Sequence, residues 1–583
     1  MLETRFGTGL QFLSTWRAWQ LDPLRPQLLH YVSVTQSPPC VADLLECATP
    51  YPELTPLAQA LSTQWVGLLP GFHRFMLDGG RVMLTLCVGE LMGTLRDQRF
   101  VADTIYLDAD PATFSHWTAK ALARCSRRGT RLLATSRTNR LQTELTQCGF
   151  EAQAPAGSTG EEGLQWQFNP RWTLKNTRDR TQTPAASSGS CAVIGAGLAG
   201  ASVAAALARR GWQVCVLDQG DTPAAGASGL PVGLVVPHVS FDDCALSRLS
   251  RSGVRLMLQQ ARHLLQEGLD WGATGTLECR VDGSPGLPSN WPAEGQAWSQ
   301  VAAPSRRTAQ NLAPDIPAVW HHQAAWLKPA QLVKAWLAQP GVTFQGRAQV
   351  AALRQAGGQW EVLDAQDGVL AIADRVVFAN ADGAMPLLNG LVKRDPALDL
   401  LLDRLPVMHG VHGLLSWGLH TETPGAPFPP FPVNGSGSVI PAVPMGEQSG
   451  SPLAWYVGSS YQPTRQPEWP NDKNHAANLA RVRLLNPDLA TALEKPFSDG
   501  TVQTWKSVRC VTSDRLPLVG PLNMAEHPSL WICAGMGSRG MSFSVLCAEF
   551  LAAQWGAEPL PIDAGLAHML VALRGRAKSG KID

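Results

Sequence analysis

One segment limits the possible folds of this chain more than any other. It spans residues 191–218 and reads CAVIGAGLAGASVAAALARRGWQVCVLD. It carries Gly195, Gly197 and Gly200 as G-x-G-x-x-G, between an apolar run and an alanine-rich helical pattern, and a second apolar run ends at Asp218. This order of strand, tight turn, helix, strand and acidic residue predicts the βαβ unit that binds dinucleotides. A glycine-rich turn in an ordinary α/β domain is the alternative, and the complete surrounding pattern argues against it.

Each glycine of this motif, and the acidic residue that follows it, has a physical role. Gly195 permits the tight turn, Gly197 lets backbone N–H groups approach a pyrophosphate at the positive end of the helix, and Gly200 lets helix and strand pack closely. A carboxylate at the end of the second strand can bind ribose hydroxyls. We therefore assign to the cofactor site Gly195, Ala196, Gly197, Gly200 and Asp218.

Length and composition narrow the class of protein. A chain of 583 residues is too long for a single core, and 45% hydrophobic with 16% charged residues is typical of a globular protein. No apolar run approaches the length of a membrane helix, and the N-terminus shows no secretory signal, so we expect a cytoplasmic protein without a membrane partner. The net charge of +1 neither indicates nor excludes a nucleic-acid partner, and DNA is not expected. The 12 cysteines lack C-x-x-C spacing and predict reduced thiols and no metal site.

The pattern along the chain predicts two α/β domains. Helical patterns alternate with β-like runs at 28–34, 81–89, 104–110 and 130–136, which favours a Rossmann-like domain with a largely parallel sheet over residues 1–172. A polar stretch rich in Pro, Ser and Gly predicts a linker at 173–190. The second domain, 191–583, has a nucleotide-binding α/β part and an inserted antiparallel α+β substrate part, roughly 275–375 and 400–505.

The C-terminal part of the second domain indicates which dinucleotide is bound. The run CAGMGSRGMSFSV at 533–545 predicts a strand, a glycine-rich turn and a helix that complete the cofactor site. This arrangement resembles the flavin-dependent amino-acid oxidase superfamily, in which the last helix points its N-terminus at the flavin ring and so implies FAD. Two glycine-rich loops supply further candidate FAD-binding residues: Ser228, Gly229, Gly233, Gly535, Gly537, Ser538 and Gly540.

Two arginines are candidates for binding the substrate. Arg509 in SVRCVTSDRLPLVG and Arg539 in GMGSRG stand where the resembling oxidases hold a substrate carboxylate. A guanidinium suits this role because it binds a carboxylate bidentately and keeps its charge when desolvated. Structural salt bridges are the alternative for both arginines. His321-His322 and the pair His409 and His412 do not form a metal-ligand cluster, and paired loop histidines are more often solvated or hydrogen-bonded.

The first domain resembles a methyltransferase. Its first residues, ETRFGTGL at 3–10, place Gly7 and Gly9 in a turn after Glu3. Further segments that resemble methyltransferases follow in the order typical of such domains: LLPGFHRFML, LTLCVGEL and DTIYLDAD. Together with the second domain, the chain closely resembles the bifunctional tRNA 5-methylaminomethyl-2-thiouridine biosynthesis proteins over nearly its whole length. That resemblance implies an S-adenosylmethionine site with Glu3, Gly7, Gly9 and Glu90, and Asp108 as the catalytic candidate of this domain.

The resemblance also implies the chemistry and the partner. The family substrate is 5-carboxymethylaminomethyl-2-thiouridine at the wobble position of certain tRNAs, whose side chain is an N-substituted glycine. Flavin-dependent oxidation of its CH₂ gives an imine that releases glyoxylate and leaves 5-aminomethyl-2-thiouridine, which the first domain then methylates. Arg509 and Arg539 would recognise the carboxylate. An oxidase for free amino acids or secondary amines, with a non-catalytic first domain, remains the alternative, and a tRNA-binding protein with two decayed sites is a third reading.

Most departures from the family pattern lie in the first domain. Arg5 replaces the first glycine of the turn, Thr35 stands where a ribose-binding Glu is usual, and the Asn-Pro element after Asp108 is missing. We hypothesise that methyltransferase activity is weak or lost, and we expect the strand that leads into the turn to be absent. In the second domain, HGVHG at 409–413 replaces a segment that commonly resembles Arg-Gly-Gln.

Basic residues near the end of the first domain are candidates for contacting RNA phosphates. Six arginines fall within 124–140, and a solvated protein surface is the equal alternative. They are Arg124, Arg127, Arg128, Arg131, Arg137 and Arg140.

Overall fold

The computed structural model describes residues 1–98, 100–108, 114–135, 138–153, 164–172, 188–313, 315–393, 402–446, 448, 450–522 and 529–575. The chain forms two compact units: Met1–Ser188 with Ala552–Ala567, and Gly189–Leu551 with His568–Asp583. Most of the predicted linker, residues 173–187, lies outside the described residues. The α/β fold class expected from the sequence is confirmed, with a mainly parallel sheet in each unit.

The first unit is built on one eight-stranded sheet in the order β3-β4-β2-β1-β5-β6-β8-β7. The central pairs β4-β2, β2-β1, β1-β5 and β5-β6 are parallel, and the two edges are antiparallel. Its strands are β1 (Leu2–Glu3), β2 (Leu29–Thr35), β3 (Gly71–Leu77), β4 (Val82–Val88), β5 (Ala102–Leu107), β6 (Ser126–Ala134), β7 (Phe150–Gln153) and β8 (Leu164–Phe168). Its helices include α1 (Leu10–Leu21), α2 (Val41–Glu46), α3 (Thr55–Ser62), α4 (Leu91–Asp97), α5 (His116–Arg124) and α6 (Asn139–Gln147).

The expected absence of a leading strand is wrong. Leu2 and Glu3 form β1 in the middle of the sheet, where Leu2 pairs with Val32 on one side and Ile105 on the other. Leu2 is fully buried, so even a two-residue strand is held by apolar contacts as well as by its ladder hydrogen bonds. The glycine-rich turn therefore starts from a fixed point in the sheet.

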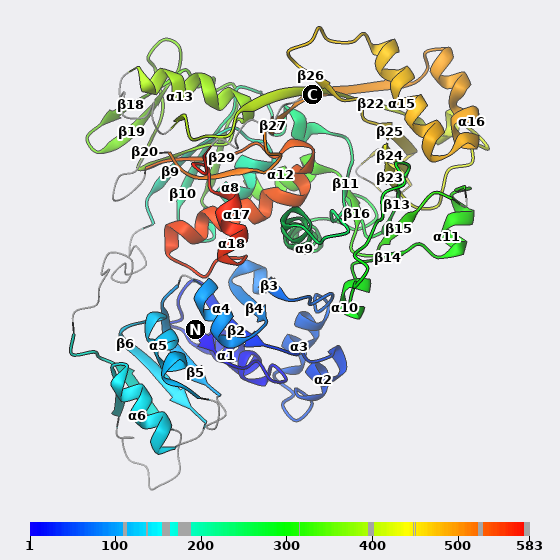
Figure 1. Ribbon diagram of the computed structural model, residues 1–583. Helices are drawn as coiled ribbons and strands as arrows, with labels where there is room; N and C mark the ends of the chain where they lie inside the picture. The colour runs from blue at the N-terminus through cyan, green and yellow to red at the C-terminus, as the bar shows by residue number, and fades with distance from the viewer. Residues whose placement is uncertain are drawn as a thin grey trace. The chain divides into compact units, whose positions relative to one another are not determined.

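The second unit begins with the predicted βαβ motif. Strand β9 (Ser190–Ile194), helix α8 (Leu198–Ala208) and strand β10 (Gln213–Leu217) open a six-stranded sheet in the order β17-β10-β9-β21-β29-β28. Figure 1 shows the C-terminal segments, in orange and red, returning to this sheet. The other strands are β17 (Val342–Gln345), β21 (Arg375–Phe378), β28 (Leu518–Pro521) and β29 (Leu530–Ala534), and α17 (Gly540–Gly556) follows β29. The predicted return of the chain end to the cofactor sheet is confirmed, and β21 joins the same sheet from the middle of the chain.

A nine-stranded, mostly antiparallel sheet forms the other large layer of this unit. Its strands are β13 (Thr276–Cys279), β14 (Ser299–Val301), β15 (Ala318–His321), β22 (Met408–Leu419), β23 (Val433–Gly435), β24 (Gly437–Pro444), β25 (Leu453–Gly458), β26 (Gln462–Pro463) and β27 (Gln503–Thr512). β22 and β27 pair over ten residues, which sets Val411 opposite Arg509. Helices α15 (Asn471–Leu485) and α16 (Pro487–Ser498) contribute Val482, Leu485, Leu489 and Leu493 to the core that this sheet shares.

Smaller elements complete the second unit. Two three-stranded sheets are formed by β11 (Gly233–Val235), β12 (Trp271–Gly272) and β16 (Ala325–Leu327), and by β18 (Ala352–Ala356), β19 (Gln359–Leu363) and β20 (Val369–Ala373). The remaining helices of this unit include α9 (Ala245–Leu264), α10 (Ala293–Gln296), α11 (Pro304–Ala309), α12 (Pro329–Leu337) and α13 (Ala384–Val392), while α18 (Ala564–Leu570) begins in the part of the chain that belongs to the first unit. Among the described residues, no helix is both long and apolar enough to cross a membrane.

Candidate active site

The glycine-rich turn after β9 is shaped by close backbone contacts. Gly195 has φ 106°, and a Cβ there would lie 2.7 Å from the Ala379 carbonyl oxygen. A Cβ at Gly200 would come within 1.8 Å of the Gly195 carbonyl oxygen. Neither position has room for a side chain, so the turn and the start of α8 are packed as a dinucleotide site requires.

Two side chains hold this turn in place. The Asp218 carboxylate accepts the Ala196 N–H at 2.6 Å through one oxygen and the Gly220 N–H at 2.7 Å through the other. The Ser228 hydroxyl accepts the Leu198 N–H at 2.9 Å, at the first turn of α8. Each carboxylate oxygen keeps a second lone pair, so Asp218 can still accept a ribose hydroxyl while it closes the turn.

A large cavity of about 1600 Å³ runs from this turn to the C-terminal glycine-rich segment. Its volume exceeds the range of about 300–1000 Å³ that is usual for small-molecule sites. Ala196, Gly200 and Gly229 are predicted site residues that do not line it. The predicted site residues that line it are Gly195, Gly197, Asp218, Ser228, Gly233, Arg509, Gly535, Gly537, Ser538, Arg539 and Gly540.

Gly233 has a packing role as well as a place on this wall. A Cβ on it would come within 2.3 Å of the Met541 methyl group in α17, so the glycine lets that helix approach β11. Gly535 and Gly537 both have positive φ, 72° and 58°, which glycine adopts without strain. These glycines bring the N-terminus of α17 to the cavity, where its partial positive charge favours an anion or an electron-rich ring.

Arg509 extends from β27 into the cavity and is held by three oxygen atoms. It donates to the Ser538 hydroxyl at 3.1 Å, to the Ser459 hydroxyl at 3.1 Å and to the Ser460 carbonyl at 3.0 Å. None of these partners is a carboxylate, so the charge is positioned without being neutralised. Burial lowers the pKa of Arg509, yet a guanidinium stays protonated in such surroundings.

Arg539 closes the 3-10 turn Gly537–Arg539 just before α17 and lines the same cavity. In the described part of the chain, no hydrogen bond or ion pair to its guanidinium is found. Burial lowers the pKa of Arg539 first, the charge of Arg515 lowers it further, and Cys244 and Glu278 raise it. Two partly buried guanidinium groups thus line one cavity with donors free for an incoming carboxylate.

Glu278 and His321 are functional candidates that the sequence reading missed. Glu278 in β13 lines the cavity, and its Oε2 lies 2.8 Å from Nε2 of His321 in β15. His321 was expected in a loop with His322, but it is a fully buried strand residue whose Nδ1 lies 2.8 Å from the Ser299 hydroxyl. The sequence feature that could have pointed to this site is the presence of a glutamate inside the short apolar run TLEC at 276–279.

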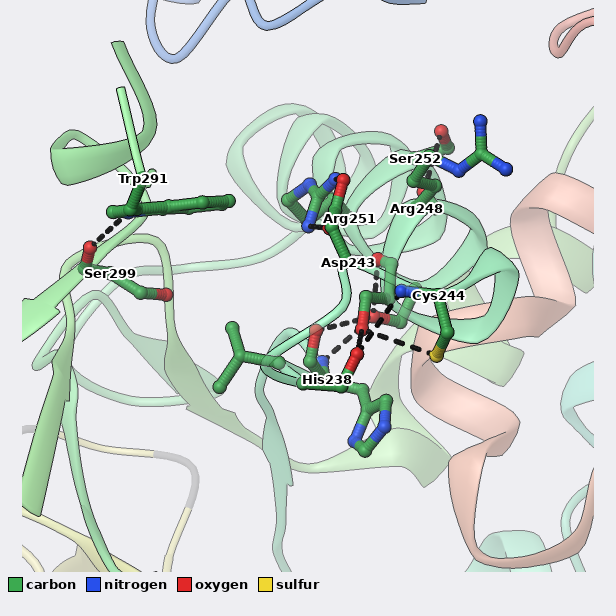
Figure 2. Close-up of polar contacts among 12 residues, drawn as sticks. His238, Asp243, Cys244, Arg248, Arg251, Ser252, Trp291 and Ser299 are labelled. Carbon is green, nitrogen blue, oxygen red and sulfur yellow. Dashed lines mark hydrogen bonds and ion pairs between the residues drawn. The ribbon is translucent and has the colours of Figure 1, made fainter. Parts of the chain in front are cut away.

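His238 lies on a loop that is tied to α9. Its backbone N–H donates to the Ser250 hydroxyl at 2.7 Å, and Asp243 on the same loop pairs with Arg251 at 2.6 and 2.9 Å (Figure 2). The Arg251 guanidinium also lies over the Trp291 ring, 5.5 Å from its centroid. Burial and then the charge of Arg539 lower the pKa of His238, which keeps this cavity-lining imidazole neutral near pH 7.

The glycine-rich turn of the first unit keeps the conformation expected of it. Gly7 and Gly9 have φ 56° and 90°, and Gly9 precedes α1 as its N-cap. Glu3 is only 4% exposed and accepts a hydrogen bond from the Ser33 hydroxyl at 2.6 Å. Burial raises the pKa of Glu3 to about 7, and the Ser33 hydrogen bond only partly opposes this shift.

The other predicted residues of this unit are engaged by the protein itself. The Glu90 carboxylate caps α4 by accepting the N–H groups of Met92 and Gly93 at 2.9 and 2.7 Å. The Thr35 hydroxyl donates to the Ser37 carbonyl at 2.9 Å. Asp108 accepts from the Thr135 hydroxyl at 3.2 Å and lies 3.8 Å from the Arg5 guanidinium. Glu90 keeps a free lone pair on each oxygen, as Asp218 does, whereas Thr35 has no carboxylate to offer and Asp108 faces the charge of Arg5.

The basic residues of 124–140 divide into engaged and exposed side chains. Arg127 pairs with Asp103, and Arg128 donates to Asn169 at 2.8 Å and to the Trp172 carbonyl at 3.2 Å. Arg124 and Arg131 are exposed, and Arg137 lies outside the described residues. The contact of these residues with RNA stays a prediction.

Comparison with known proteins matches each half of the chain to a family model. Residues 190–554 match the family model described as FAD dependent oxidoreductase, and residues 52–162 match that of the S-adenosyl-L-methionine-dependent methyltransferases, which leaves the turn at Gly7 outside. The fold and cavity thus define an FAD-dependent oxidoreductase joined to a methyltransferase-like unit.

Relatives of nearly the same length define the family more closely. The chain is 58% identical to the tRNA 5-methylaminomethyl-2-thiouridine biosynthesis bifunctional protein MnmC of Albidiferax ferrireducens, over 99% of this chain and 92% of that protein. It is 46% identical to the protein of that name from Polaromonas sp. strain JS666, over 99% and 91%. The chain belongs to this MnmC family. Among solved structures it is similar to glycine oxidase from Geobacillus kaustophilus, with a TM-score of 0.49 and 18% identity over 67% of this chain and 99% of that one.

Proposed function

We propose that this protein removes the carboxymethyl group of 5-carboxymethylaminomethyl-2-thiouridine at the wobble position of tRNA and leaves 5-aminomethyl-2-thiouridine. One observation carries the proposal: Arg509 and Arg539 line the same cavity as the dinucleotide turn at Gly195. A cavity with two guanidinium groups suits a substrate that bears a carboxylate. The names of the MnmC relatives supply the RNA context.

The residues of the second unit fit FAD. The crowded turn at Gly195 and Gly200, together with the start of α8, offers backbone donors to a pyrophosphate, and Asp218 offers acceptors to a ribose. Gly535, Gly537, Ser538 and Gly540 bring the α17 N-terminus to the flavin end of the cavity. When bound, FAD supplies the acceptor for the hydride that leaves the substrate CH₂.

The chain's own residues orient the substrate. Arg509 and Arg539 hold the carboxylate, so that the adjacent CH₂ has one fixed position in the cavity. Loss of a hydride from this CH₂ converts the secondary amine to an iminium ion. Water then adds to the iminium carbon, and cleavage of the C–N bond releases glyoxylate and the primary amine of the nucleoside.

The first unit is proposed to bind tRNA and to retain little methyltransferase activity. Arg5 stands in the place of a glycine and pairs with Asp108, and Thr35 lacks the two acceptors of a carboxylate. Each lost contact to S-adenosylmethionine costs about 1 kcal/mol, so several together weaken binding by orders of magnitude. We further propose that the protein works in the cytoplasm, where tRNA is modified.

Mass spectrometry of digested tRNA tests these proposals. The purified flavoprotein is incubated with carboxymethylaminomethyl-modified tRNA, with and without S-adenosylmethionine, and separately with glycine or N-methylglycine. We expect aminomethyl-thiouridine in both tRNA reactions and little of the methylated product. Oxidation of the free amino acids with no change in tRNA would instead support the amine-oxidase alternative. Full conversion to the methylated nucleoside, with S-adenosylmethionine binding in calorimetry, would disprove the proposed weakness of the first unit.

A further inference from the structure

A buried chain of polar groups ends in a carboxylate at the cavity wall. The Ser299 hydroxyl lies 2.8 Å from Nδ1 of His321, and Nε2 of His321 lies 2.8 Å from Oε2 of Glu278. Ser299 and His321 are both fully buried, and β13, β14 and β15 fix all three residues. Substrate has no access to this serine, so the geometry resembles a catalytic triad but serves to position Glu278.

These contacts fix the direction of one hydrogen bond. The carboxylate can only accept, so Nε2 of His321 carries a proton and donates it to Glu278, while Nδ1 contacts the Ser299 hydroxyl. Arg280 approaches the other oxygen, Oε1, at 3.3 Å, and is itself fixed through a hydrogen bond to the Val239 carbonyl at 2.9 Å. Glu278 is therefore held in one orientation from two sides.

Glu278 is ionised in this setting. Burial alone would raise the pKa of Glu278, but the hydrogen bond and charge of His321, with the charges of Arg280 and His238, outweigh burial and lower it. The ionisable groups that act on this carboxylate include His238, Cys279, Arg280, His321 and Arg539. Further ionisable groups that line the same cavity include Asp218, Asp382, His412, Glu468, Arg481, Lys506, Arg509 and Arg515. The wall of the cavity thus includes the carboxylate of Glu278, which can face a cation, as well as the guanidinium groups of Arg509 and Arg539, which can face an anion.

We propose that Glu278 binds the substrate nitrogen and stabilises its positive charge, first as the bound secondary ammonium and then as the iminium ion that forms when the hydride leaves. An N-substituted glycine is a zwitterion at neutral pH, and Arg509, Arg539 and Glu278 match its two charges. The inference rests on the proposed function, because it takes the substrate to be an amine with an adjacent carboxylate. His321 and Ser299 are positioning residues that act through Glu278.

A direct contact between Glu278 and the substrate nitrogen changes how the rate of flavin reduction depends on pH, whereas a purely structural role of Glu278 does not. The ammonium must lose a proton to solvent before a hydride can leave, so the rate of flavin reduction rises with pH as the bound amine deprotonates. A neighbouring carboxylate favours the ammonium form and raises the pKa of the bound amine. Replacing Glu278 by a neutral residue therefore moves the rising limb of the pH profile to lower pH, while the plateau rate falls because the iminium loses its counter-charge.

The test is anaerobic flavin reduction by modified tRNA, followed from pH 6 to pH 10 in the flavin-loaded protein. For Glu278→Gln we expect the rising limb to shift by about one pH unit downward and the plateau to fall by about 10²-fold. Glu278→Asp keeps the charge, so its limb stays at the wild-type pH although its rate falls. Glu494→Gln is the matched control, because this glutamate lies on α16 outside the cavity lining, is exposed and pairs with Arg483 at 2.6 Å, and its profile should not change.

The outcomes separate this inference from the proposed function. An unshifted limb in Glu278→Gln, or an equal shift in Glu278→Asp, would overturn the role of Glu278 while wild-type oxidation of the tRNA stands. A wild-type protein that leaves the tRNA unchanged would overturn the proposed function itself. If Glu278→Gln does not load flavin, Glu278→Ala is the neutral variant that decides, and an unshifted limb in it would equally overturn the role of Glu278.

Discussion

Gly413 leaves the space that the Arg509 guanidinium occupies. A Cβ at Gly413 would come within 2.1 Å of Nη2 of Arg509, across the paired strands β22 and β27. The segment HGVHG at 409–413 departs from the pattern common in the family, and the structure gives its last glycine a clear purpose. The position of a charged group in the cavity thus depends on a residue without a side chain on the neighbouring strand.

Replacing Gly413 by alanine should displace Arg509. The added methyl group forces the guanidinium away from Ser459, Ser460 and Ser538, at a cost of about 1–3 kcal/mol. We expect kcat/KM for modified tRNA to fall by about 10- to 100-fold, mainly through KM, with flavin content unchanged. Gly390→Ala is the control, because a Cβ there meets no atom within 4 Å. Equal kinetics in the two variants would contradict the account.

Lysine cannot replace Arg509 or Arg539 in carboxylate binding. It keeps the charge but loses the planar pair of donors, so each substitution should lower kcat/KM by about 10-fold or more. Steady-state kinetics with modified tRNA measures the loss, and the flavin spectrum shows whether the cofactor site is intact. The control is Arg483→Lys, since Arg483 is exposed on α15 and pairs with Glu494 at 2.6 Å. Unchanged kinetics in both cavity variants would remove them from the substrate site.

Alanine at Gly200 should abolish flavin binding. Its Cβ would overlap the Gly195 carbonyl oxygen, so the turn must open before α8 can pack on β9. We expect the purified variant to be colourless, with folded secondary structure by circular dichroism, whereas Gly390→Ala stays yellow. A yellow Gly200→Ala protein would show that the turn does not hold the cofactor.

Glu3 should make the first unit less stable at higher pH. Burial raises its pKa from 4.5 to about 7, so between these values the folded state binds the proton more tightly than the unfolded state. Stability is therefore fully present below pH 4.5 and falls by about 3 kcal/mol as pH rises through 7. Calorimetric melting at pH 5 and pH 8 should show a smaller drop in Tm for Glu3→Gln than for the wild type.

An exposed residue provides the comparison for Glu3. Glu46 lies on the surface of α2, and Glu46→Gln should keep the wild-type difference between pH 5 and pH 8. If Glu3→Gln also kept this difference, the buried carboxyl would not be the source of the pH dependence.

The features that the sequence predicts best are those formed by residues close together in the chain. The turn at Gly195 and Gly200, the helix after it and Asp218 lie within one βαβ unit, where spacing alone specifies the geometry. The resemblance to known oxidases then added Arg509 and Arg539, which the cavity brings together.

The missed features depend on contacts between distant strands. Glu278 and His321 lie 43 residues apart and meet only because β13 pairs with β15. The space that Gly413 leaves for Arg509 depends on the register of β22 against β27, which no local pattern specifies. The two-residue strand β1 was overlooked because its stability comes from neighbours on both sides, not from its own length.

Anaerobic titration of the flavin-loaded protein with modified tRNA tests the central claim most directly. Carboxymethylaminomethyl-modified tRNA should bleach the flavin at about one equivalent and release one glyoxylate, since one hydride leaves each substrate CH₂. The same tRNA with an aminomethyl group, which lacks the carboxymethyl carbon, should leave the flavin oxidised. Bleaching by free glycine or N-methylglycine, with no bleaching by the modified tRNA, would contradict the account.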